Sequence, residues 1–160
     1  MKALIYIILV VTFVYQQVLA QAYEPSKNNL AYDSLLAKRL GADEYGMKNY
    51  VIAFLKAGPV KIQDSIKRIE LQRMHLKNIM RLATEGSLII AGPFLDDQPL
   101  RGIFIFNVES VEKAKVLAET DPAVQAGTLV LELHPWYGSA ALMEVPEIHS
   151  TIEKKSVAGD

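Results

Sequence analysis

One histidine and one aspartate have the residue types and settings expected of a general acid–base pair. His75 lies within a helical segment, and Asp121 directly precedes Pro122. Histidine titrates near neutral pH, and a neighbouring carboxylate can fix its tautomer and increase its basicity. If the fold brings the two side chains together, the sequence predicts a His75–Asp121 dyad that moves protons on a small-molecule substrate.

Each member of this pair also has a purely structural interpretation. His75 lies in an apolar stripe of its helix, where it would be a packed histidine bonded to a backbone carbonyl. Asp121 would cap the helical turn that Pro122 begins. If the ends of the two predicted helices are level, the pair is separated by roughly 16 Å along the axis. Contact then requires the first helix to extend past the second, or the turn at Asp121 to fold back.

A second set of candidates could bind an apolar or aromatic ligand. Phe104 and Phe106 alternate along one predicted strand, and His134 and Trp136 alternate along another. These four side chains are predicted to line a face between two sheets. For His134 and Trp136 the alternative is a structural role at a subunit interface, where aromatic residues are common.

Composition excludes several function classes. The chain has 160 residues, 51% of them hydrophobic, and a net charge of −1, so it predicts one domain with a substantial core and no nucleic-acid partner. It has no cysteine, which removes disulfides, thiolate nucleophiles and thiolate metal sites. The histidines form no short-spaced pair. We therefore expect no metal and no cofactor.

The N-terminal segment has the pattern of a secretory signal peptide. Lys2 precedes an apolar run, and Ala20 and Ala22 provide the small residues of a cleavage site. We expect a signal peptide at residues 1–22, cut after Ala20 or Ala22, and a protein exported to a bacterial periplasm without stable membrane insertion. The alternative is an uncleaved N-terminal anchor.

The remaining chain divides into a linker with a short helix (23–47), a main domain (48–142) and a polar tail (143–160). Within the domain we expect strands at 50–57, 87–91, 101–108 and 128–134, and helices at 62–85 and 110–119. This βαββαβ order predicts an α+β ferredoxin-like fold, in which a four-stranded antiparallel sheet carries two helices on one face.

Both faces of the predicted strands are apolar, although helices cover only one of them. Ile103 and Ile105 point to one side of their strand, while Phe104 and Phe106 point to the other. Something must cover the second face, and the simplest cover is a second copy of the sheet. The sequence therefore predicts a homodimer.

Several short motifs resemble the YCII-related family. They begin with His75-Leu76 and Ala91-Gly92-Pro93-Phe94, continue through Arg101-Gly102-Ile103-Phe104-Ile105-Phe106, and end with Asp121-Pro122, Gly127 and His134-Pro135-Trp136-Tyr137. The preceding residues 38–47 resemble the N-terminal extension of an exported bacterial subgroup.

The resemblance implies a dimeric α/β-barrel whose suspected active site is formed by His75 and Asp121. It supplies no substrate, because the reactions of the family are mostly unassigned. We therefore expect a small-molecule enzyme that performs proton abstraction, isomerisation or hydrolytic dehalogenation-type chemistry. The alternative is a non-catalytic dimeric module that binds an apolar or aromatic molecule between its sheets.

Overall fold

A computed structural model describes residues 31–157 of the chain. The predicted signal peptide lies outside the described residues, as does the first part of the linker. Among residues 31–157, no helix combines the length and the apolar character needed to cross a membrane.

The secondary structure follows the predicted βαββαβ order and adds short elements around it. The elements are α2 (Ser34–Leu40), β1 (Met47–Ala57), α3 (Ser65–Thr84), β2 (Leu88–Pro93), β3 (Leu100–Phe106), α4 (Val111–Ala118), α5 (Pro122–Gln125), β4 (Leu129–Ser139), η1 (Ala140–Glu144) and α6 (Val145–Ile152).

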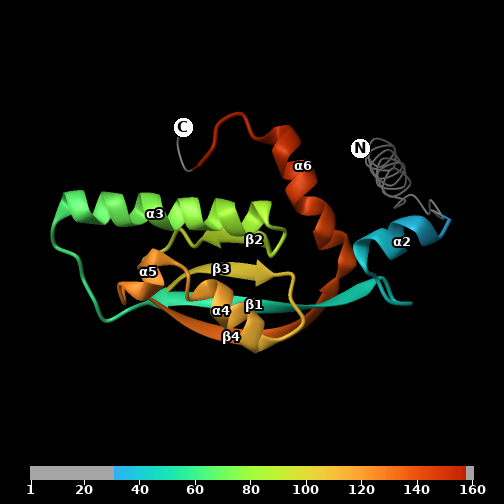
Figure 1. Ribbon diagram of the computed structural model, residues 1–160, viewed down its shortest axis with the longest axis horizontal. Helices are drawn as coiled ribbons and strands as arrows, with labels where there is room; N and C mark the ends of the chain where they lie inside the picture. The colour runs from blue at the N-terminus through green and yellow to red at the C-terminus, as the bar shows by residue number, and fades with distance from the viewer. Residues whose placement is uncertain (1–30, 158–160) are drawn as a thin grey trace, which may run out of the picture. The chain divides into compact units, whose positions relative to one another are not determined.

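The four strands form one antiparallel sheet in the order β2-β3-β1-β4. Helices α3 and α4 both contribute side chains to a core on one face of this sheet. They run in opposite directions along it, because each helix returns along the strand that precedes it and β1 and β3 are antiparallel (Figure 1). The predicted α+β ferredoxin-like fold is confirmed.

Side-chain caps set the helix boundaries. The Asp64 carboxylate accepts from the backbone N–H groups of Ile66 and Lys67, so α3 begins at Ser65 and not at the predicted residue 62. The helix ends before Gly86, whose φ of 72° lies in the left-handed region that glycine adopts without steric cost.

The main core lies between the sheet and helices α3 and α4. Leu82 of α3 and the small side chains of Ala114 and Ala118 of α4 pack against large apolar residues of the central strands. The three alternating leucines of β4 also face this core, as the sequence predicted: they are Leu129, Leu131 and Leu133.

The two phenylalanines of β3 belong to this core, and their predicted place on the uncovered face is wrong. Phe106 lies opposite Val51 and Phe104 opposite Ala53, and they are 0% and 2% exposed. Period-two alternation shows that Phe104 and Phe106 share a face, but it does not show which face the helices cover. The small residues of α4 leave room for the two rings.

The opposite face of the sheet is partly covered by the chain itself. Tyr50, Ile89 and Ile105 form a second buried cluster, and Leu142 and Met143 of η1 pack against it. The predicted polar tail at 143–160 is therefore corrected, because α6 occupies Val145–Ile152. Pro146, in the first turn of α6, is suited to a helix start because that turn needs no donor from it.

Candidate active site

The His75 and Asp121 side chains are in direct contact. His75 lies midway along α3, and its Nδ1 is 2.6 Å from Oδ2 of Asp121. The His75 side chain is 13% exposed, whereas Asp121 is completely buried. The sequence therefore identified two residues that the fold brings together, although they are 46 positions apart.

Asp121 is held in place by the backbone on both sides. Its Oδ1 accepts from the Ala123 N–H at 2.8 Å, which caps α5, and its own N–H donates to the Ala118 carbonyl. One carboxylate oxygen thus serves the helix cap while the other faces the imidazole. The cap expected of Asp121 and its contact with His75 therefore occur in the same side chain.

The direction of the helices explains why the expected separation of 16 Å does not occur. That figure assumed helices with level ends, whereas α3 and α4 are antiparallel (Figure 1). The chain leaves the end of α4 and runs back beside α3. Thr120 then lies beside Asn78, Asp121 beside His75, and α5 farther towards the start of α3.

A polar clamp fixes the segment just before Asp121. Arg81 donates to Asn78 Oδ1 and to Thr120 Oγ1, at 2.9 Å in each case. The clamp joins α3 to the residue adjoining Asp121. Neither Asn78 nor Arg81 was identified from the sequence, because only the fold shows that they reach Thr120.

The His75 ring is also fixed from the side of the sheet. It stacks on Phe104, with ring centroids 6.1 Å apart and an interplanar angle of 21°. Phe104, predicted to bind substrate, instead supports the histidine from the core. In the described part of the chain no hydrogen bond reaches Nε2 of His75, the ring nitrogen directed away from the carboxylate.

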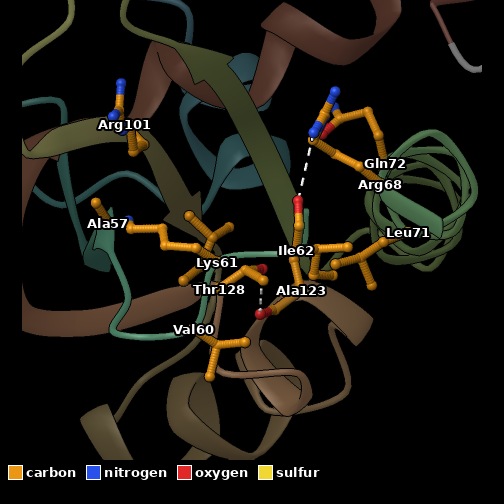
Figure 2. Close-up of a pocket in the computed structure, with 11 residues that line it drawn as sticks. Ala57, Val60, Lys61, Ile62, Arg68, Leu71, Gln72, Arg101, Ala123 and Thr128 are labelled. Atoms are coloured by element: carbon orange, nitrogen blue, oxygen red, sulfur yellow. Dashed lines mark hydrogen bonds between the residues drawn. The ribbon is translucent and has the colours of Figure 1, made fainter. Parts of the chain in front are cut away.

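A cavity of about 410 Å³ lies at the start of α3 (Figure 2); His75 and Asp121 do not line it, but residues next to them do. Leu71, one helical turn before His75, lines it, as does Ala123, whose N–H caps Asp121. Three cationic residues also line it: Lys61, Arg68 and Arg101. No sequence pattern links these three residues, since they come from a loop, a helix and a strand.

His134 and Trp136 lie on the other face of the sheet, away from the pair. His134 Nε2 is 2.9 Å from Glu132, which also pairs with Lys56. Lys56 and then His134 lower the pKa of the Glu132 carboxyl below its ordinary value. The Trp136 ring packs against the Tyr50 ring, with ring centroids 5.8 Å apart. The four predicted ligand-binding residues are therefore divided between two faces.

No cluster of three or more metal-ligating side chains of the kind that holds a metal ion occurs among residues 31–157. A second hollow, of about 500 Å³, lies between α3, β2 and α6. It lies towards the end of α3, on the side away from Leu71.

Comparison with known proteins gives a family match and several matching solved structures, one of which is described below. A family model described as the YCII-related domain matches residues 50–137, more than half of the chain. No curated protein sequence matches this chain. A similar solved structure is 5-chloro-2-hydroxyhydroquinone dehydrochlorinase from Burkholderia phenoliruptrix AC1100, in complex with 2,5-dihydroxybenzoquinone. It is 24% identical, with a TM-score of 0.41, and the match covers 56% of this chain and 93% of that one.

Proposed function

We propose that this chain, which belongs to the YCII-related family, is a small-molecule enzyme with His75 as its general acid–base and Asp121 as the residue that orients it. The observation that supports this most directly is the 2.6 Å contact between Nδ1 of His75 and a fully buried carboxylate. An exposed pair would have little constraint on its geometry. Here the cap at Ala123 and the stacking on Phe104 fix both partners.

The contact between Nδ1 and Asp121 supports different roles for the two ring nitrogens. Asp121 is acceptor-only when ionised, so the neutral ring carries its proton on Nδ1 and leaves a lone pair on Nε2. Nε2 removes a proton from the substrate, and the buried carboxylate stabilises the imidazolium that forms. The protonated Nε2 then returns the proton to another atom of the substrate. A positioned general base of this kind contributes about 10²–10⁴-fold to a rate.

Solvent-deuterium exchange against a panel of compounds tests this function. The protein is incubated in D₂O with small ketones, phenols and halogenated aromatic acids. NMR then follows deuterium incorporation, isomerisation and halide release. We expect turnover of at least one compound by the native protein and a loss of at least about 100-fold in His75→Gln.

The matched control is His134→Gln, the same substitution at an exposed histidine on the other face of the sheet. It should leave turnover unchanged. Equal turnover by native protein and His75→Gln, or no turnover across the panel, would contradict the proposed role of the pair.

A homodimer through the uncovered sheet face is also part of the proposal. After η1 has covered Tyr50 and its neighbours, Ile52, Phe54 and Ile103 remain only half-buried on that face. A second copy would remove this apolar area from water. The alternative function, a ligand held between two sheets, is less well supported because Phe104 and Phe106 lie in the main core, between the sheet and helices α3 and α4.

A further inference from the structure

The cavity beside the His75–Asp121 pair combines an apolar lining with an excess of positive charge. Lys61, Arg68 and Arg101 line it, and no aspartate or glutamate of the described residues does so. These three side chains are exposed, and within residues 31–157 none of them has a carboxylate partner in an ion pair. Their charge is therefore available to a ligand.

The cations that line the cavity come from different backbone settings. Arg101 falls at an irregularity of β3, where Leu55 and Lys56 of β1 pair with Gly102 and Leu100 and skip Arg101. The Arg68 guanidinium donates to the Ile62 carbonyl at 3.3 Å. Figure 2 shows Arg68 and Arg101 on opposite sides of the cavity, with Lys61 between them.

The remaining walls are suited to an apolar molecular body. Leu71, Ile62, Leu129 and Ala123 contribute apolar surface, and Gln72 and Thr128 add polar groups. A volume of about 410 Å³ lies within the range of small-molecule sites, roughly 300–1,000 Å³. The cavity is large enough for a substituted aromatic ring.

We infer that this cavity binds a small carboxylate with an aromatic or similarly apolar body, its negative charge attracted by the cations Lys61, Arg68 and Arg101 around the cavity. A ligand seated there contacts Leu71 and Ala123, the neighbours of His75 and Asp121 respectively. The statement that this ligand is a substrate rests on the proposed function of His75. The binding of the ligand does not depend on that function, because the cations and the apolar walls bind it without proton transfer.

Binding can be measured with benzoate as the probe and benzamide as its neutral counterpart. Titration of ¹⁵N-labelled full-length protein is followed by amide chemical shifts. We expect benzoate to shift the amide signals of Leu71, Ala123 and Thr128 and to bind at least about five-fold more tightly than benzamide, the ratio given by one ion pair about 4 Å apart in water. Inorganic phosphate, which lacks the apolar body, should bind more weakly than benzoate.

Variants test whether the named cations are responsible. At least one of Arg101→Gln and Arg68→Gln should weaken benzoate binding about five-fold, and both should leave benzamide binding unchanged. The control is Arg73→Gln, on the same helix, where the arginine pairs with Glu70 and does not line the cavity. Added salt should weaken benzoate binding and spare benzamide binding.

Three results would overturn the inference. They are equal affinities for benzoate and benzamide, shifts that map to residues outside the cavity, and equal benzoate affinity in the native protein and both cavity variants. His75→Gln separates this inference from the proposed function. If it binds benzoate normally while turnover is the same as in native protein, only the catalytic role fails.

Discussion

Asp121→Asn should convert His75 to the wrong tautomer while leaving the fold almost intact. Asparagine is about as good a helix N-cap as aspartate, so its amide oxygen can continue to accept from the Ala123 N–H. The amide NH₂ then faces Nδ1 of His75, where the carboxylate oxygen now lies 2.6 Å away. The ring accepts this hydrogen bond only when its own proton is on Nε2.

The magnitudes follow from the bonds that are lost. Exchanging a charge-assisted hydrogen bond for a neutral one costs about 1 kcal/mol of unfolding free energy. Asp121→Ala removes the cap, at about 0.5–2 kcal/mol, and leaves the buried His75 donor without its partner, at about 1–3 kcal/mol. The alanine variant should therefore lose about 1.5–5 kcal/mol, more than the asparagine variant loses. Catalysis should fall by about 10²–10⁴-fold in Asp121→Asn, since Nε2 would be a donor instead of a base.

Long-range ¹H–¹⁵N correlation spectra report the tautomer directly, and urea denaturation reports stability. Asp64→Asn is the matched control, because Asp64 caps α3 in the same way but does not contact His75. We expect Nδ1–H in native protein and in Asp64→Asn, and Nε2–H in Asp121→Asn. An Asp121→Asn protein that keeps both the Nδ1–H tautomer and full turnover would refute the reasoning.

Phe54→Asp should convert a dimer to a monomer in sedimentation velocity, because the charge lies on the sheet face opposite the helices; an unchanged sedimentation coefficient would count against the dimer. Gly58→Ala should lose about 1–3 kcal/mol in urea denaturation, since its Cβ would overlap the Gly127 carbonyl oxygen; native stability would show that the backbone yields there. Lys56→Met should raise the pKa of Glu132, measured by carboxyl NMR, because Lys56 is the main cause of its depression. The stabilisation of the fold by the Lys56–Glu132 pair should be complete above pH about 4.5 and be lost as the pH falls through the lowered pKa of Glu132. If Lys56→Met leaves the acid side of the stability-versus-pH curve unchanged, this expectation is contradicted.

The sequence predicted the order of the elements because local patterns carry it. Period-two alternation predicted the strands, and helical spacing predicted α3 and α4. The alternation along β4 also correctly placed Leu129, Leu131 and Leu133 on the face that the helices cover. Alternation could not show on which face of the sheet Phe106 lies, since that depends on which face the two helices cover. The helix α6 had a local signal, the apolar spacing of Val145, Ile148 and Ile152, which its polar surroundings obscured.

The candidate site was predictable only in part, for a similar reason. His75 and Asp121 could be selected by residue type and motif, but their contact depends on the antiparallel run of two helices. Arg101 had no distinctive local pattern, and it reaches the cavity through an irregularity in strand pairing. A bulge of this kind arises from the register between two strands, so one strand alone does not show it.

The unequal lengths of the two helices explain why the pair and the cavity occur together. Helix α3 has 20 residues and α4 has eight, which correspond to about 30 Å and about 12 Å. Thr120, just after the end of α4, lies beside Asn78 and Arg81, so the first half of α3 extends beyond the end of α4. The turn at Asp121 and helix α5 fill part of this space and bring the carboxylate to His75. The part left unfilled, between Leu71 and the loop before α3, is the cationic cavity. The same difference in helix length therefore leaves room both for the turn that brings Asp121 to His75 and for the cavity.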